Sequence, residues 1–139
     1  MVQSGGGRGP RLPLKVMRAL TPGTQSVLIV DNDPAIRAAL TQALQRGGFA
    51  AEAVAGGREA LARLTRASFS LVVTDLKMPD VTGLDVLRAL QRLGLPVPVI
   101  VMTADGSVEN AVEAMQAGAC DYLLKPVAPE SLETSVRKA

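Results

Sequence analysis

Four short, mostly aliphatic and β-branched runs recur along the chain, and each stops abruptly at a polar side chain. The runs cover residues 27–30, 71–74, 99–102 and 122–124, and they are followed by Asp31, Asp75, Thr103 and Lys125. Runs of this length and composition are typical of parallel strands buried on both faces. The carboxyl ends of parallel strands lie at one edge of a sheet, where open α/β sheets hold their ligands. The pattern therefore predicts a fold that brings these four side chains together.

Helical patterns separate the runs. Asp33 suits the N-cap and Pro34 the first turn of a helix that ends at Gly47 and Gly48. A further strand is expected over residues 49–54, with helices over residues 58–64, 84–90 and 108–115 and from Pro129 onward. Five strands alternating with five helices predict a doubly wound α/β fold with helices on both faces of a parallel sheet. The common strand order for five such units is 2-1-3-4-5.

Apolar residues at helical spacing predict the faces with which these helices meet the sheet. Cys120 is expected to be a small buried residue. The predicted apolar faces consist of Ile36, Leu40 and Leu44; Leu61 and Leu64; Leu84, Leu87 and Leu90; Val108, Ala111, Val112 and Met115; and Leu132 and Val136.

Composition and charge exclude several classes of protein. Only three residues are aromatic, which argues against a surface that stacks nucleic-acid bases. The absence of histidine and the single cysteine argue against a zinc site. A single cysteine also excludes an internal disulfide and fits a reducing compartment. No apolar run reaches membrane-spanning length, so we expect a cytoplasmic protein. Residues 1–25 carry four basic residues and no acid, and they predict a flexible basic tail before a single domain at residues 26–139.

The side chains at the strand ends form a set with a definite chemistry. Asp31, Asn32 and Asp75 supply hard oxygen ligands, which suit Mg²⁺. Lys125 would bind a phosphoryl oxygen as a point charge, and the Thr103 hydroxyl could donate a hydrogen bond to another. A carboxylate that faces such cations can act as a nucleophile toward phosphorus. The set predicts a site where a carboxylate accepts a phosphoryl group.

Four motifs resemble those of the response-regulator receiver domains of two-component signalling. They are VDNDP at residues 30–34, TDLKMPD at 74–80 followed by Gly83, VMTA at 101–104 and DYLLKP at 121–126. Residues 111–119 are also similar to the fourth helix of receivers attached to enhancer-binding or FixJ-type transcription activators. The resemblance covers residues 26–139.

The resemblance implies a role for each motif residue. Asp75 would accept the phosphoryl group from a sensor histidine kinase or a phosphotransfer domain. Mg²⁺ would be held by Asp31, Asp75, the Lys77 carbonyl and the position of Asn32, and the phosphoryl group by Thr103, the Ala104 amide and Lys125. Such a domain is a switch that gains and loses its own phosphoryl group, not a turnover enzyme.

The resemblance also implies an output. Tyr122 would turn inward as Thr103 moves, and this would alter the face made by the fourth helix, the fifth strand and the fifth helix. That face is a candidate surface for a homodimer. Regulation of transcription would then need a DNA-binding or ATPase effector domain outside this chain, because this domain is not expected to bind nucleic acid itself.

One position departs from the family pattern. The family usually has two acids after the first strand, the second a direct metal ligand, and here that position is Asn32. Asp33 comes one residue too late, so we expect weakened Mg²⁺ binding. We also expect a cis peptide bond between Lys125 and Pro126, and Lys77 to face Asp105 across the mouth of the site.

Two alternatives belong to other classes of function. A degenerate receiver would act as a protein-interaction module without phosphorylation; Asn32 favours this, whereas Asp75, Thr103 and Lys125 oppose it. A small flavodoxin-like enzyme or flavin carrier would need aromatic residues to sandwich the flavin or a GxxxxGK[ST] phosphate loop; the sequence has only three aromatic residues and no such loop.

Overall fold

The structure is a computed structural model and describes residues 25–139, so the predicted tail lies almost wholly outside the described residues. The strands are β1 (Ser26–Val30), β2 (Ala50–Val54), β3 (Leu71–Asp75), β4 (Val99–Thr103) and β5 (Asp121–Leu124). The helices are α2 (Pro34–Arg46), α3 (Gly57–Arg66), α4 (Gly83–Leu93), α5 (Val108–Gln116) and α6 (Pro129–Lys138). Strands and helices alternate strictly, as the sequence predicts.

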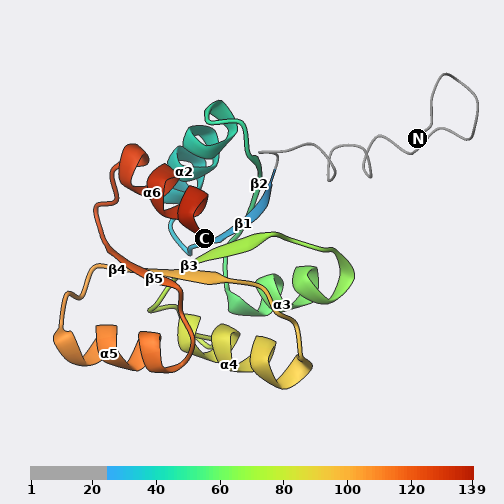
Figure 1. Ribbon diagram of the computed structural model, residues 1–139, viewed down its shortest axis with the longest axis vertical. Helices are drawn as coiled ribbons and strands as arrows, with labels where there is room; N and C mark the ends of the chain where they lie inside the picture. The colour runs from blue at the N-terminus through green and yellow to red at the C-terminus, as the bar shows by residue number, and fades with distance from the viewer. Residues whose placement is uncertain (1–24) are drawn as a thin grey trace, which may run out of the picture.

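The strands form one parallel sheet in the order β2-β1-β3-β4-β5, which confirms the predicted topology. Helices α2 and α6 cover one face of this sheet, and α3, α4 and α5 cover the other (Figure 1). Successive residues of a strand point to opposite faces. Val27 and Ile29 of β1 accordingly pack in the core under α2 and α6, whereas Leu28 and Val30 pack in the core under the other three helices.

The strand register brings the predicted polar residues to one edge of the sheet. Val30 pairs with Thr74, Asp75 with Met102, and Thr103 with Leu124. Asp31 and Lys125 therefore follow directly on strands that end level with Asp75 and Thr103. This edge is the carboxyl end of the sheet.

The predicted inward face of α5 is wrong for three of its four residues. Val108, Val112 and Met115 are 72%, 47% and 47% exposed, whereas Ala114 is fully buried. Ala111 and Ala117 are half-buried, so α5 meets the sheet through its alanines. Helical spacing identifies an apolar stripe but does not say which stripe faces the core, and small side chains allow a helix to approach the sheet closely. The other predicted faces contain the buried residues Leu40, Leu44, Leu64, Leu87, Leu90, Leu132 and Val136.

The expectation for Cys120 is also wrong, because this residue is exposed. It lies in the turn before β5, where its N–H donates to the Val99 carbonyl, and it is not part of the pleated strand. Partial burial and the neighbouring Asp121 carboxylate raise the pKa of the thiol.

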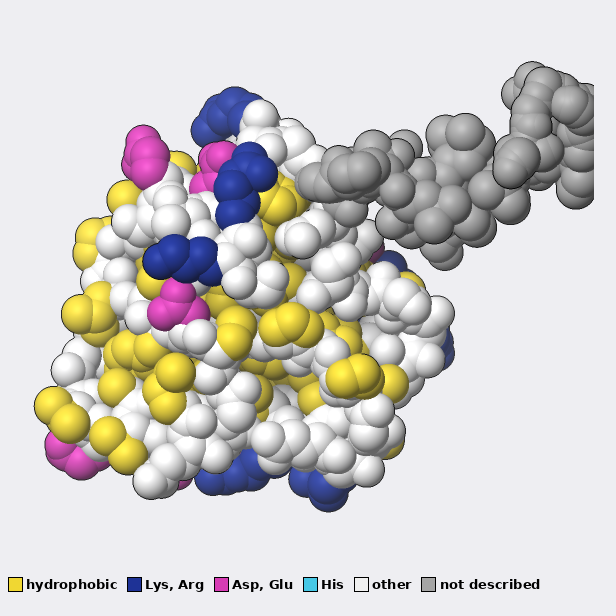
Figure 2. Space-filling view, viewed as in Figure 1, with side chains coloured by type: hydrophobic (Ala, Val, Ile, Leu, Met, Phe, Trp, Pro, Cys, Tyr) yellow, Lys and Arg dark blue, Asp and Glu magenta, His cyan; other side chains and the backbone are white. Residues whose placement is uncertain are grey.

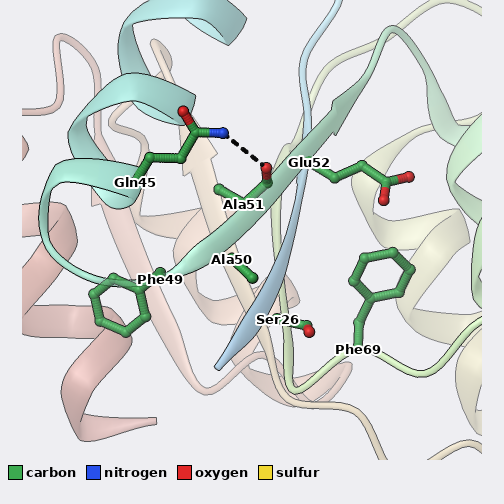
Figure 3. Close-up of a pocket in the computed structure, with 7 residues that line it drawn as sticks. All are labelled: Ser26, Gln45, Phe49, Ala50, Ala51, Glu52 and Phe69. Atoms are coloured by element: carbon green, nitrogen blue, oxygen red, sulfur yellow. Dashed lines mark hydrogen bonds between the residues drawn. The ribbon is translucent and has the colours of Figure 1, made fainter. Parts of the chain in front are cut away.

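At the other end of the sheet, a hollow of about 390 Å³ lies beside β2 and the start of β1 (Figure 3). The Gln45 side chain reaches across it and donates to the Ala51 carbonyl at 3.3 Å. Glu52, on its rim, is paired with Arg63 of α3. None of the predicted site residues lines this hollow.

Among the described helices, none has both the length and the apolar character needed to cross a bilayer.

Candidate functional site

Asp75 lies at the floor of a crevice of about 370 Å³ at the carboxyl edge of the sheet. It is the last residue of β3 and is only 7% exposed. Its Oδ2 lies 3.1 Å from Lys125 Nζ, and its Oδ1 accepts from the Lys77 amide at 3.3 Å. Thr103, Ala104 and Asp105 complete the crevice wall. The structure thus brings together the predicted acceptor, hydroxyl and ammonium groups.

Asp31 contributes a second carboxylate, which is completely buried. Its Oδ2 lies 2.6 Å from Lys125 Nζ, and its Oδ1 accepts from the Asp33 amide at 2.8 Å. A buried carboxylate is tolerated only when it is paired and hydrogen-bonded, and both conditions are met here. The predicted N-cap role of Asp33 is confirmed, because its side chain accepts from the Ala35 and Ile36 amides.

Lys125 links the two carboxylates. Burial opposes its charged form, but hydrogen bonds and attraction to Asp31 and Asp75 outweigh burial and raise the pKa of Lys125 above its usual value. The ammonium is therefore charged throughout the physiological range. The peptide bond that follows it, Lys125–Pro126, is cis, as predicted.

Lys77 and Asp105 face each other across the mouth of the crevice, which confirms a further prediction. Their side chains form an exposed ion pair at 2.8 Å. The hydrogen bond from Lys77 lowers the pKa of the Asp105 carboxyl, and Asp105 raises the pKa of Lys77.

Asp105 also connects the crevice with Tyr122. Its amide donates to Thr103 Oγ1 at 3.1 Å, and its carbonyl accepts from the Tyr122 hydroxyl at 2.8 Å. Tyr122 is half-buried and packs against the core under α3, α4 and α5. Burial and the Asp105 carboxylate raise the pKa of the Tyr122 hydroxyl. The two predicted switch residues therefore contact the same short loop after β4.

The donor set at this edge fits Mg²⁺. Within residues 25–139 no group of three or more acidic, histidine or cysteine side chains could hold a metal. Mg²⁺, however, typically uses one or two carboxylates and completes its shell with water and phosphate oxygens. Asp31 and Asp75 supply two carboxylates, and the loops after β1 and β3 carry the exposed Asn32 and the Lys77 carbonyl.

Two contacts at the site were not foreseen from the sequence. The Arg37 guanidinium reaches back from α2 and donates to the Asp31 carbonyl at 2.7 Å. Gly83 begins α4 so close to β3 that an added Cβ would lie 2.5 Å from the Asp75 carbonyl oxygen. The motif already included Gly83, but not its close approach to β3, and nothing local in the sequence marks the arginine.

Comparison with known proteins decides the family. Residues 27–137 match the family model described as the response regulator receiver domain. The chain belongs to this family. The receiver domain is 37% identical to the transcriptional regulatory protein ZraR of Escherichia coli (strain K12) over 86% of this chain and 27% of ZraR. It is 37% identical to the C4-dicarboxylate transport transcriptional regulatory protein DctD of Rhizobium meliloti (strain 1021) over 82% of this chain and 25% of DctD. It therefore spans about a quarter of the length of these relatives.

Solved structures agree with this assignment. The crystal structure of FixJ-N superposes with a TM-score of 0.77 at 36% identity, over 82% of this chain and 91% of that one. The response regulator receiver protein from Pseudomonas putida superposes with a TM-score of 0.80 at 34% identity, over 86% of this chain and all of that one (100%). The receiver resemblance is confirmed, and the flavodoxin-like alternative and the degenerate-receiver alternative are not favoured.

Proposed function

We propose that this receiver domain is a phosphorylation switch in which Asp75 accepts a phosphoryl group from a sensor histidine kinase or a phosphotransfer domain. The observation that carries the proposal is the position of the Asp75 carboxylate, which lies at the floor of an open crevice 3.1 Å from a charged lysine. Of the two buried carboxylates at this edge, Asp75 lines the crevice, whereas Asp31 does not. Asp75 is therefore the one that an incoming phosphorus atom can reach.

The surrounding side chains have complementary roles in this reaction. An Asp75 oxygen attacks phosphorus and releases the donor histidine. Lys125 compensates the growing negative charge, and the Thr103 hydroxyl and the Ala104 amide donate to the phosphoryl oxygens. Asp31, Asp75, Asn32 and the Lys77 carbonyl would hold Mg²⁺, which when bound neutralises charge on the transferred group.

The switch would act through the loop after β4. If Thr103 turns its hydroxyl toward a phosphoryl oxygen, the hydrogen bond from the Asp105 amide changes, and the Tyr122 contact with the same residue changes with it. The expected result is a set of amide shift changes concentrated in residues 103–127. Changes confined to α2 and α3 would contradict this model of the output.

The face made by α5, β5 and α6 is the candidate partner surface. Val108, Val112, Met115 and Leu124 are exposed there, and Figure 2 shows hydrophobic side chains at the surface in this region. Contiguous apolar surface favours association with another apolar face. We propose that a second copy of the domain covers it after phosphorylation, and that the domain acts with an effector domain that regulates transcription, as the names of the relatives suggest.

Intact mass spectrometry tests the acceptor directly. Incubation with acetyl phosphate and Mg²⁺ should add one phosphoryl group, about 80 Da, to the wild type and none to Asp75→Asn. Asp80→Asn is the matched control, because Asp80 is an exposed carboxylate in the loop after β3 and asparagine tolerates its left-handed backbone (φ 65°). If Asp75→Asn gains the same mass at the wild-type rate, the assignment is wrong.

A further inference from the structure

Arg37, which does not line the crevice, binds the main-chain carbonyl of the buried residue Asp31. Asp31 is fixed at four points: its amide donates to the Val54 carbonyl, its two carboxylate oxygens bind the Asp33 amide and Lys125, and its carbonyl accepts from Arg37 Nη1. Two of the other three contacts are made by backbone groups, and the third is made by Lys125, which also contacts Asp75. Only the Arg37 contact depends on a side chain that has no other assigned function.

The position of Arg37 on its helix is unfavourable for a cation. It lies in the first turn after the Asp33 N-cap, where its amide bonds the Asp33 carbonyl, and the first turn of α2 contains no acid. The positive end of a helix disfavours a cation. The charge-assisted bond of 2.7 Å to the Asp31 carbonyl offsets this cost, because the contact is partly shielded from water.

The composition of the loop makes the position of Asp31 decisive. Asn32 is neutral and exposed, and the Asp33 carboxylate is used as the N-cap. Asp31 is thus the one carboxylate that the loop after β1 directs toward Asp75. Any rotation of the peptide groups around it would turn this carboxylate away from Lys125 and from a cation bound beside it.

We propose that Arg37 is a positioning residue for the acceptor site: by binding the Asp31 carbonyl it fixes the Asp31 carboxylate and so strengthens Mg²⁺ binding. The inference rests on the proposed function, because it concerns the same site. A purely electrostatic effect of Arg37 would have the opposite result. If Arg37 acted only through its charge, it would repel Mg²⁺, and its removal would tighten metal binding.

Arg37→Met removes the charge and the donor but keeps an unbranched apolar stem. Arg46→Met is the matched control, because Arg46 is an exposed arginine in the last turn of the same helix. Two quantities are measured by NMR without any phosphodonor. The first is hydrogen exchange of the Asp33 amide, which donates to Asp31 Oδ1, with the Leu44 amide as a reporter of the stability of α2 as a whole. The second is Mg²⁺ affinity, from a titration of amide shifts.

In Arg37→Met we expect about tenfold faster exchange of the Asp33 amide, unchanged exchange of the Leu44 amide, and Mg²⁺ binding weakened about three- to tenfold. Arg46→Met should leave all three unchanged. Unchanged exchange at Asp33, or Mg²⁺ affinity that is equal or higher in Arg37→Met, would overturn the proposal. Because neither measurement involves phosphorylation, a wild-type protein that fails to gain a phosphoryl group would refute the proposed function without deciding the role of Arg37.

Discussion

Replacing Lys125 with methionine should destabilise the domain strongly, because it leaves two buried carboxylates without their shared cation. The ammonium lies 2.6 Å from Asp31 Oδ2 and 3.1 Å from Asp75 Oδ2, and the Lys125 side chain is only 16% exposed. Methionine keeps the apolar stem, so the change removes charge without opening a large cavity.

The magnitude follows from the geometry. Two oxygens that contact one ammonium lie within about 6 Å of each other, where unit charges repel by about 3 kcal/mol at an effective dielectric constant near 20. Removing one partner of a buried ion pair typically costs about 3–5 kcal/mol. Since the lysine retains some contact with water, we expect the free energy of unfolding to fall by about 3 kcal/mol.

Urea denaturation followed by circular dichroism measures this loss, with Lys77→Met as the control. Lys77 also pairs with a carboxylate at the same crevice, but its side chain is 65% exposed, so its replacement should cost far less. Equal losses in the two variants, or a loss of less than about 1 kcal/mol in Lys125→Met, would refute the reasoning.

The pH dependence has a definite sign. The carboxylates outweigh burial and raise the pKa of Lys125 in the folded state, so its stabilisation is fully present below the unfolded value of about 10.4. The difference between wild type and Lys125→Met should be constant from about pH 7 to 9 and should shrink as the pH rises through the folded pKa.

Three further predictions concern the surroundings of the site and the edge of the sheet. Gly83→Ala would place a Cβ 2.5 Å from the carbonyl oxygen of Asp75, so we expect urea denaturation to show a loss of about 1–3 kcal/mol and phosphorylation to be slower. In Gly56→Ala the added Cβ meets nothing within 4 Å, so this variant should fold like the wild type. The hydrogen bond from Arg63 lowers the pKa of Glu52 in the folded state. Any stability that the wild type has over Glu52→Gln should therefore be present above about pH 4.5 and should be lost as the pH falls through the lowered folded-state pKa. A difference in stability that grows toward low pH would contradict this. Asn32→Asp adds a full negative charge beside the proposed Mg²⁺ site and should tighten Mg²⁺ binding about tenfold in a shift titration. Equal affinities of the two proteins would show that another group already serves as the ligand.

The sequence by itself determined the parts of this receiver domain that depend on local order along the chain. Buried runs that end at Asp31, Asp75, Thr103 and Lys125 predicted both the parallel sheet and the edge at which these side chains meet, because the carboxyl ends of parallel strands are level. The N-cap at Asp33 was also predictable, since capping involves residues only two or three positions away.

The tertiary structure alone decided which groups touch across the fold. Periodicity showed that α5 has an apolar stripe, but packing turned its alanines to the sheet and left Val112 and Met115 exposed. Exposure of Cys120 likewise depends on where the turn before β5 lies against its neighbours. The contact of Arg37 with the Asp31 carbonyl needs the exact orientation of α2 on β1. Such contacts depend on side-chain size and on the relative placement of elements far apart in sequence, and no local pattern encodes these.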